Sequence, residues 1–262
     1  MPDRLLSLDT PVVIAHRGGS RLRPENTLAA FEHAVAIGAD AIECDVHLSK
    51  DGEVVVIHDD TVDRTTDGRG AVSSFTADAL ARLDAAAAFR DLDGQPAFRQ
   101  LGIGVPRLEA VLTRLPATPV VIELKGRDPA IVDPVLAVIR RCGRERDVVI
   151  GGFSLPVLAA VRERAAGIPT SASTPEVRSA LRRSWFRLPP RPTGCRLFQL
   201  PLVYGGRRVI RPRLTRVLRR AGLPMHAWII DDPVEMRMLL AWGVTGIITD
   251  RPDLARDVVR SC

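Results

Sequence analysis

Short apolar runs alternate with amphipathic helical patterns along most of the chain. The apolar runs predict buried strands, and the helical patterns between most of them predict helical crossovers. The predicted strands lie near residues 12–15, 40–46, 119–125, 147–152, 168–172, 197–201, 225–230 and 246–249. The predicted helices lie near residues 27–37, 130–142, 156–166, 175–184, 212–221 and 233–241. This alternation predicts a parallel α/β fold.

The number of strands favours a closed barrel. Eight predicted strands with helical connections are typical of a TIM (β/α)8 barrel, whereas an open doubly wound sheet lacks support because no GxGxxG opens a helix here. A length of 262 residues suits one such barrel, so we expect a single domain over 1–262.

One long interval interrupts the alternation after the second predicted strand. It begins with HLSKDGEVVVIHD, in which Asp51-Gly52 is a good hairpin turn. An Ala-rich pattern then predicts a helix around 76–89. We interpret the interval as an inserted segment over about 60–105, carried on one barrel loop. Long insertions in compact domains usually cover or border a site, so we expect this one beside the entrance.

The net charge of the chain gives little information about its binding partners. Its net charge of +6 and pI of 9.9 are compatible with an anionic partner. However, Lys50 and Lys125 are the only lysines among 37 basic residues, and the arginines include clusters such as 206–220 that suit solvated helix surfaces. Aromatic residues make up 4% of the chain, which is too few for a nucleic-acid platform. We therefore predict no nucleic-acid partner.

The cysteines and the N-terminal segment indicate the cellular compartment in which we expect the protein. No CxxC pair occurs among the four cysteines Cys44, Cys142, Cys195 and Cys262, so neither a zinc site nor a disulfide framework is indicated. The first residues lack the long apolar core of a signal peptide, and no apolar run reaches transmembrane length. These features predict a reducing, cytoplasmic setting.

Ionisable residues gather where the predicted strands end. The carboxyl ends of parallel barrel strands form one face, and barrel active sites lie there. The residues delivered to that face by the strands and the hairpin are His16, Arg17, Glu43, Asp45, His58, Asp59, Glu123, Lys125 and Trp228. Collecting so many charged groups at one end of a barrel costs too much desolvation to be incidental. The sequence therefore predicts a functional site at this face.

Two of these strands predict a metal site. Glu43 and Asp45 are two residues apart, so they point to the same side of a strand, and Glu123 and Lys125 repeat this spacing. Three converging carboxylates would repel one another and raise their pKa values, which a bound divalent cation relieves. Oxygen ligands favour Mg²⁺ or Ca²⁺ over zinc. The alternative is a set of structural ion pairs with barrel arginines.

The remaining groups suit acid–base chemistry on a phosphate. His16 and His58 flank the first carboxylate pair, and imidazoles with a pKa near 6.5 can accept and donate a proton near neutral pH. Lys125 offers a compact charge and Arg17 a forked donor set for phosphate oxygens. The alternative for both cations is a structural ion pair. We interpret the other histidines, His33, His47 and His226, as structural.

Seven motifs in order resemble one family. AHRGG…PENT, IECDVHLSKDGEVVVIHD, RTTDGRG, VPRLEAVL, VVIELK, HAWIIDDP and GVTGIITDRPD are together similar to the glycerophosphodiester phosphodiesterases, from about 12 to 254. The resemblance implies the phosphodiesterase form of the TIM barrel, with a segment inserted after strand two. The usual Trp-Thr-Val-Asn is replaced by Trp228-Ile229-Ile230-Asp231, and the usual Gly-Val-Asp-Gly by Gly243-Val244-Thr245-Gly246.

The resemblance also implies roles for single residues. It implies a divalent metal, Mg²⁺ or Ca²⁺, at Glu43, Asp45 and Glu123. It implies His16 and His58 as the acid–base pair, and Arg17 and Lys125 as phosphate contacts. Asn26 would order the loop after the first strand or touch the substrate, and Trp228 would form an apolar wall near the glycerol.

The expected activity is metal-dependent hydrolysis of a glycerophosphodiester, a small-molecule substrate, to glycerol 3-phosphate and an alcohol. The nucleophile is water or the glycerol 2-hydroxyl. One alternative is a lysophospholipase D-like activity on single-chain lipids, with Trp185 and Phe186 of SWFRLPPRP contacting a membrane surface. A second alternative is a non-catalytic barrel that binds a phosphate ester.

Overall fold

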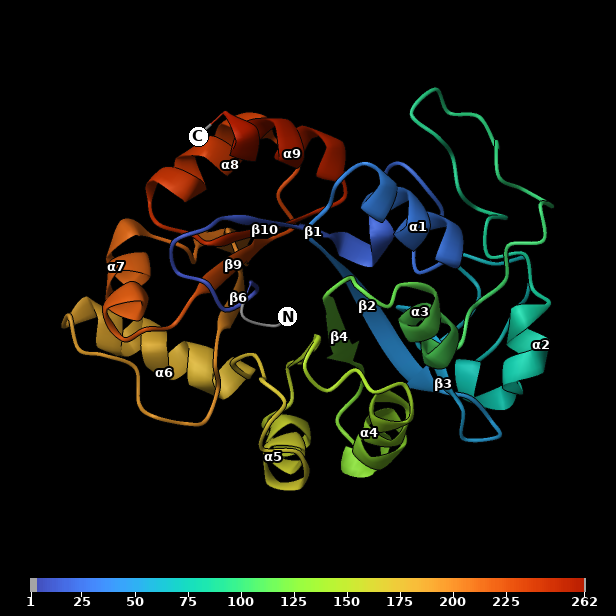
Figure 1. The fold of residues 1–262 in the computed structure, drawn as a ribbon, viewed down its shortest axis with the longest axis horizontal. Helices are drawn as coiled ribbons and strands as arrows, with labels where there is room; N and C mark the ends of the chain where they lie inside the picture. The colour runs from blue at the N-terminus through green and yellow to red at the C-terminus, as the bar shows by residue number, and fades with distance from the viewer. Residues whose placement is uncertain (1–3, 262) are drawn as a thin grey trace.

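The computed structural model describes residues 4–261, so residues 1–3 and Cys262 of the predicted domain lie outside the description. Parallel strands form a curled sheet that helices surround (Figure 1). The hydrogen-bonded order is β5-β4-β2-β1-β10-β9-β6. These strands are β1 (Val12–Ala15), β2 (Ala41–Leu48), β4 (Val120–Leu124), β5 (Val148–Gly151), β6 (Phe198–Pro201), β9 (Met225–Trp228) and β10 (Gly246–Thr249).

The predicted strand at 168–172 closes the barrel as isolated pairings and not as a regular strand. Thr170 pairs with Ile150 of β5, and Ser171 pairs with Leu197, the residue before β6, in both cases parallel. Pro169 accepts a hydrogen bond from Ile150 at 2.9 Å, but it has no N–H to donate in return. The eighth member of the barrel is therefore shorter than predicted, and it lies in the expected place.

All six predicted crossover helices are present. They are α1 (Leu28–Ala36), α4 (Val132–Arg141), α5 (Leu155–Arg164), α6 (Thr174–Trp185), α7 (Pro212–Arg220) and α8 (Pro233–Ala241). Two further helices, α3 (Leu108–Arg114) and α9 (Pro252–Arg260), were not predicted. None of the helices within residues 4–261 combines the length and apolar character needed to cross a bilayer.

The segment after β2 folds back as a hairpin with β3 (Val54–Val56), which pairs antiparallel with β2. The inserted residues then pack on the outer side of this hairpin, where Val62, Val72 and Leu80 join a buried apolar cluster with Val55 and Ile57. In Figure 1 the insertion, which includes α2 (Ala77–Ala81), lies at the side of the barrel where α1 lies. It thus extends the barrel wall next to β2 and α1.

The helix predicted around 76–89 is wrong beyond its first turn and a half. Only α2 (Ala77–Ala81) is helical, after a short 3₁₀ turn at Val72–Ser74. The Asp84 carboxylate accepts hydrogen bonds from the backbone N–H groups of Ala86 at 3.0 Å and Gln100 at 2.8 Å. Such side-chain bonds compete with the helical ladder and hold the Ala-rich stretch in turns.

The barrel interior is apolar at the end opposite the charged strand ends. Leu5, Val12, Val121 and Leu197 belong to one buried cluster there. The backbone carbonyl of Leu5 accepts a hydrogen bond from His226 Nε2 at 2.9 Å, so the N-terminal segment plugs this end. The prediction that His226 is a core histidine inside its strand agrees with its complete burial.

Candidate active site

A tight turn brings His16 and Arg17 to the carboxyl end of β1. The turn, His16–Gly18, is 3₁₀, and Arg17 has φ 51°. Gly18 has φ 84°, and a Cβ there would lie 2.6 Å from the Ala30 Cβ of α1. Only glycine permits both this conformation and this approach. The Arg17 N–H donates to Glu43 Oε2 at 3.0 Å, which ties the turn to β2.

The three predicted carboxylates converge. Glu43 and Asp45 share one side of β2, and Asp45 lies opposite Glu123 in the parallel register with β4. Oxygen atoms of all three side chains lie within 4.8 Å of one another. The spacing of two along each strand and the pairing of the strands therefore produce a group of oxygen donors that can hold a metal ion.

The charge of this acidic group is only partly balanced by protein cations. Burial, together with the neighbouring Asp45 carboxylate, raises the pKa of Glu43 to about 8. Burial alone would also raise the pKa of Asp45, but Lys125 and Arg17 outweigh it and hold that pKa below its usual range. The expected rise is thus confirmed for Glu43 and wrong for Asp45.

Lys125 and Arg17 both face the carboxylates. Lys125 Nζ lies 2.8 Å from Asp45 Oδ1 and 2.5 Å from Glu123 Oε1. Arg17 lies 3.1 Å from Asp45 through Nε and 2.8 Å from Glu25 through Nη1. Both side chains line the same pocket as the acidic group. Two cations therefore stand where an anionic substrate would meet the acidic group.

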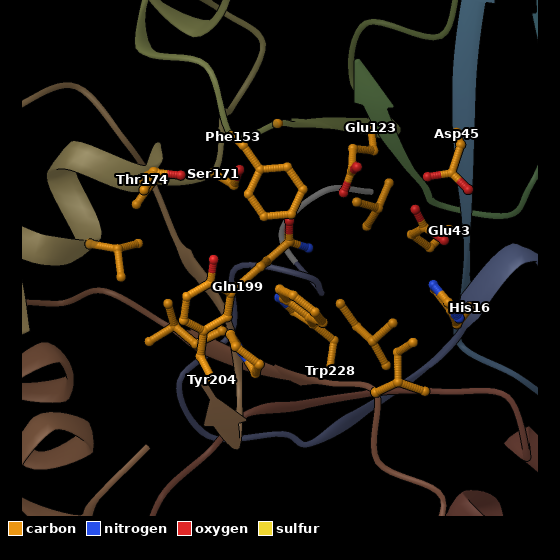
Figure 2. A pocket seen from close by; sticks show the side chains of 18 of the residues that line it. His16, Glu43, Asp45, Glu123, Phe153, Ser171, Thr174, Gln199, Tyr204 and Trp228 are labelled. Atoms are coloured by element: carbon orange, nitrogen blue, oxygen red, sulfur yellow. The ribbon is translucent and has the colours of Figure 1, made fainter. Parts of the chain in front are cut away.

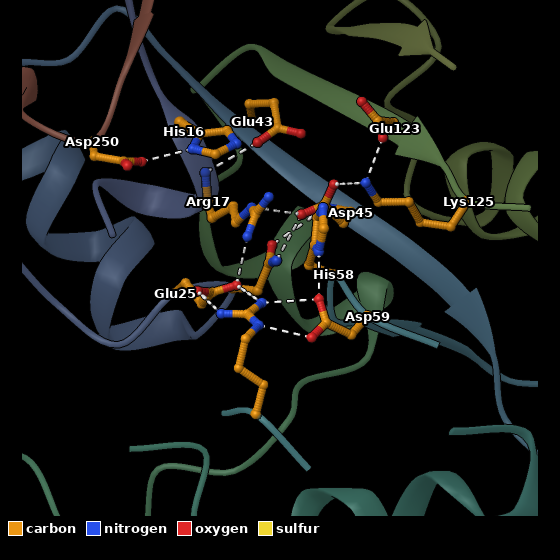
Figure 3. Close-up of polar contacts among 12 residues, drawn as sticks. His16, Arg17, Glu25, Glu43, Asp45, His58, Asp59, Glu123, Lys125 and Asp250 are labelled. Carbon is orange, nitrogen blue, oxygen red and sulfur yellow. Dashed lines mark hydrogen bonds and ion pairs between the residues drawn. The ribbon is translucent and has the colours of Figure 1, made fainter. Parts of the chain in front are cut away.

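Each of the two predicted histidines is held by a carboxylate (Figure 3). His16 Nδ1 donates to Asp250 Oδ1 at 2.6 Å, and His58 Nδ1 donates to Asp59 Oδ1 at 2.5 Å. A carboxylate on Nδ1 fixes the tautomer and leaves Nε2 free to exchange a proton. Burial lowers the pKa of His16, but the Asp250 hydrogen bond and the charge of Glu43 outweigh it and raise this pKa above 6.5.

Sequence reasoning missed Asp250 and assigned Asp59 no role. Asp250 follows β10, and its backbone N–H donates to Asp231 Oδ1 at 2.9 Å. Asp231 is the residue that replaces the usual asparagine after Trp228, and it also accepts from Thr249 Oγ1 at 2.7 Å. The motif GIITDRPD carried the signal, because Asp250 follows a predicted barrel strand just as His16 does.

Arg64 of the inserted segment joins the surroundings of His58 and Arg17. Its guanidinium donates to Glu25 Oε2 at 2.7 Å and to Asp59 Oδ2 at 2.7 Å. The hydrogen bonds from Arg64 hold the pKa of Asp59 below its usual range. Because Glu25 also binds Arg17, one ion-pair network runs from Arg17 to His58.

Asn26 is buried and turned to the acidic group. Its Nδ2 donates to Asp45 Oδ2 at 2.9 Å, and its Oδ1 accepts from the Asp45 backbone N–H at 3.3 Å. Thr27 is the N-cap of α1, since its hydroxyl accepts from the Ala30 N–H at 3.2 Å. Within residues 4–261, Asn26 is not part of the pocket lining.

Except for Asn26 and Asp59, the predicted site residues line one cavity of about 300 Å³ at the carboxyl ends of the strands. His16, Glu43 and Asp45 lie at one side of it, whereas Thr174, Gln199 and Tyr204 lie at the other, with Phe153 and Trp228 between them (Figure 2). The Phe153 and Trp228 rings pack edge to face, 6.1 Å between centroids. The lining residues that the structure describes include none from 60–105, so the insertion approaches the site through Arg64.

Fold and site together define a (β/α)8 enzyme with oxygen-donor, cationic and imidazole groups at its carboxyl-terminal face. The sequence profile of the glycerophosphoryl diester phosphodiesterase family matches residues 16–254. The chain therefore belongs to this family, as the seven motifs predicted.

Individual relatives agree with this assignment. The chain is 36% identical to the probable glycerophosphodiester phosphodiesterase 2 of Mycobacterium tuberculosis, over 95% of this chain and 90% of that protein. The crystal structure of a glycerophosphodiester phosphodiesterase from Agrobacterium tumefaciens str. C58 superposes with a TM-score of 0.77 at 32% identity, covering 94% of this chain and 99% of that one.

A further solved structure bears on the reaction. An Oleispira antarctica phosphodiesterase in complex with the product sn-glycerol-3-phosphate superposes with a TM-score of 0.80 at 25% identity, covering 96% of this chain and 97% of that one. Together these relatives identify the chain as a glycerophosphodiester phosphodiesterase, an enzyme and not a non-catalytic barrel.

Proposed function

We propose that the protein hydrolyses glycerophosphodiesters to glycerol 3-phosphate and an alcohol, with His16 and His58 as the acid–base pair and a divalent metal at Glu43, Asp45 and Glu123. The observation that carries this proposal is that both carboxylate-held histidines and the acidic group line one pocket. The substrate is a small molecule, and its phosphate lies between the two histidines and the acidic group.

The donor set fits a hard divalent cation. All the converging atoms are carboxylate oxygens. Burial and the neighbouring Asp45 carboxylate make an ionised Glu43 unfavourable and raise its pKa, a cost that a bound cation would relieve. Such donors suit Mg²⁺ or Ca²⁺. When bound, the ion would neutralise phosphate charge in the site.

Arg17 and Lys125 bind the phosphate oxygens in this proposal. Both cations are mostly buried in ion pairs with Asp45, so they reach the site already desolvated and oriented. Asn26 acts as a positioning residue, since both ends of its amide are used on Asp45. Trp228 lines the pocket as an apolar wall beside the glycerol.

Proton transfer falls to the histidines. One imidazole Nε2 takes the proton of the attacking hydroxyl as its oxygen bonds to phosphorus. The other donates a proton to the alkoxide as the opposite P–O bond breaks. With water as the nucleophile the products form in one displacement. With the glycerol 2-hydroxyl, a cyclic phosphate forms first and water then opens it with the proton roles exchanged.

A second candidate is cleavage of single-chain lysophospholipids at a membrane surface. Trp185, the last residue of α6, is 69% exposed, and the next residue, Phe186, is 77% exposed. Arg183 and Arg187 lie within the same few residues. Exposed large apolar side chains among arginines suit a peripheral contact with anionic lipid.

An assay of glycerol 3-phosphate release from a panel of glycerophosphodiesters tests the main proposal. We expect turnover that chelation abolishes and that added Mg²⁺ or Ca²⁺ restores. Glu123→Gln should weaken metal activation, whereas Glu163→Gln, an exposed position on α5, is the matched control. Full turnover in excess chelator would refute the metal requirement. Failure to cleave any diester with either metal would refute the proposed hydrolase activity.

A further inference from the structure

The pocket continues past the charged groups into an apolar arm. We use this name for the part of the cavity lined by Ala172, Val177, Leu181, Leu200, Tyr204 and Val209. Its Tyr204 lies on the side of the cavity away from His16 and the acidic group, beyond Phe153 and Trp228 (Figure 2). One ligand can therefore occupy the arm and the charged end of the cavity together.

One wall of the arm is a single face of α6. Thr174, Val177, Arg178 and Leu181 line the pocket, at positions i, i+3, i+4 and i+7 of the helix. Val177 and Leu181 pack against the core and are only half-buried, so part of each aliphatic side chain faces the cavity. Arg178 is exposed, and its guanidinium belongs to the rim.

The opposite wall comes from β6 and the hairpin that follows it. Leu200 lies on β6, and the hairpin of β7 (Val203–Tyr204) and β8 (Arg207–Arg208) places Tyr204 and then Val209 along the arm. Tyr204 is the only tyrosine of the chain and is 73% exposed. An aromatic ring so exposed on a cavity rim gains from covering by an apolar ligand.

We propose that the apolar arm binds the linear alkyl or acyl chain of a single-chain phosphodiester lipid, while its phosphate occupies the charged end. This inference rests on the proposed function, because the phosphate is placed by the same histidines and cations. Ser171 and Gln199 also line the cavity and offer polar groups to a glycerol or ester linkage. A charged end and an apolar arm in one cavity thus match the phosphate and the chain of such a lipid.

The chemistry predicts a dependence on chain length. Each methylene moved from water into the arm should improve binding by about three- to fourfold, until the arm is filled. A glycerophosphodiester without a chain leaves the half-buried faces of Val177 and Leu181 in water. Chain-bearing substrates should therefore be preferred in kcat/KM over glycerophosphocholine.

The test compares glycerophosphocholine with hexanoyl, octanoyl and decanoyl lysophosphatidylcholine, assayed as monomers through choline release. A second series carries the chain on the alcohol, as glycerophospho-hexanol, -octanol and -decanol. A rise of kcat/KM with length in the first series assigns the arm to the glycerol side of the substrate, and a rise in the second assigns it to the alcohol side. Either rise supports the proposal.

Variants distinguish binding of the chain in the arm from nonspecific binding of the chain to other apolar surface. Leu181→Gln should lower the ratio of decanoyl lysophosphatidylcholine to glycerophosphocholine kcat/KM by about tenfold. Leu92→Gln is the matched control, since Leu92 is 54% exposed in the insertion and lies outside the pocket lining. Val177→Thr should act in the same direction as Leu181→Gln and keeps the β-branched shape if the larger change harms folding.

The outcomes distinguish this inference from the proposed function. If glycerophosphocholine is cleaved but neither series rises with length, the arm does not bind a chain and the hydrolase proposal stands. Should no diester be cleaved, calorimetric titration with hexyl, octyl and decyl phosphate still decides the matter. Affinity that rises with length in the wild type and falls in Leu181→Gln supports the arm, and equal affinities refute it.

Discussion

The His16 imidazole and the Asp250 carboxylate, 234 positions apart in the chain, meet at 2.6 Å. The contact joins the end of β1 to the end of β10, which are neighbouring strands in the barrel. It raises the pKa of His16 even though the ring is buried. His16 is thereby kept in one tautomer and closer to its protonated form at neutral pH than an ordinary histidine.

Asp250→Asn should lower kcat by about 10²-fold, because the amide no longer fixes the Nδ1–H tautomer or stabilises the charged ring. The pH–rate profile is the diagnostic measurement. Losing this carboxylate should move the limb that reports His16 to lower pH. Asp257→Asn on α9 is the control. An Asp250→Asn profile that keeps the wild-type shape would contradict the assignment.

His16→Ala and His58→Ala should each lower turnover by about 10²–10⁴-fold, since each removes one partner of a proton-transfer sequence. The double variant should be little worse than the slower single variant, because the two act on the same reaction. His33→Ala on α1 should keep most activity. Near-normal turnover of His58→Ala on every diester, with His16→Ala inactive, would show that only one histidine is required.

Metal affinity should depend on pH through Glu43. Without metal its pKa is about 8, so below that pH the carboxyl holds a proton that the ion must displace. The apparent affinity should therefore rise by up to about tenfold per pH unit and level off above about pH 8. Calorimetry in buffers of different ionisation enthalpy counts the released proton. Affinity that does not change between about pH 6 and 8 would exclude Glu43 as a ligand that titrates in this range.

His226 should make the fold sensitive to acid. Complete burial lowers its pKa from 6.5 to about 4, so between these values the unfolded chain binds a proton that the folded chain does not. Stability is then present above pH 6.5 and is lost as the pH falls towards 4. From about pH 7 to about pH 5 this histidine should cost about 2 kcal/mol of unfolding free energy.

The measurement for His226 is urea unfolding at both pH values. His226→Gln keeps a donor for the Leu5 carbonyl but does not titrate, so it should lose less stability on acidification than the wild type. Equal losses in the two proteins would assign the acid sensitivity to other groups.

The barrel and the acidic group were predictable because their signals are local. Buried strands appear as apolar runs, and the spacing of two residues already places Glu43 with Asp45 on one side. The pairing of His16 with Asp250 was not predictable in this way, since a carboxylate beyond the last strand gives no sign of its partner. Arg64 carries even less signal, because a surface-like arginine in an insertion binds Glu25 and Asp59 only after the loops fold together.

The missed elements follow the same physics. Helix α9 starts with Pro252 directly after β10, so little linker separates it from the strand. The Ala-rich stretch after 81 has helical propensity, but Asp84 gives its backbone other partners. In the Ala-rich stretch, hydrogen bonds to a side chain, which periodicity does not report, decided the outcome.

The two ends of the cavity come from different halves of the polypeptide. The charged end is built from residues 16–125, with Asp250 as its late contribution, whereas the apolar arm is built from residues 172–209. A change of side chain within residues 172–209 therefore alters which molecule is selected without disturbing the charges that act on phosphorus. Selectivity and chemistry are separable in this architecture, so exchanging the span from α6 through β8 between relatives should transfer substrate preference as one cassette.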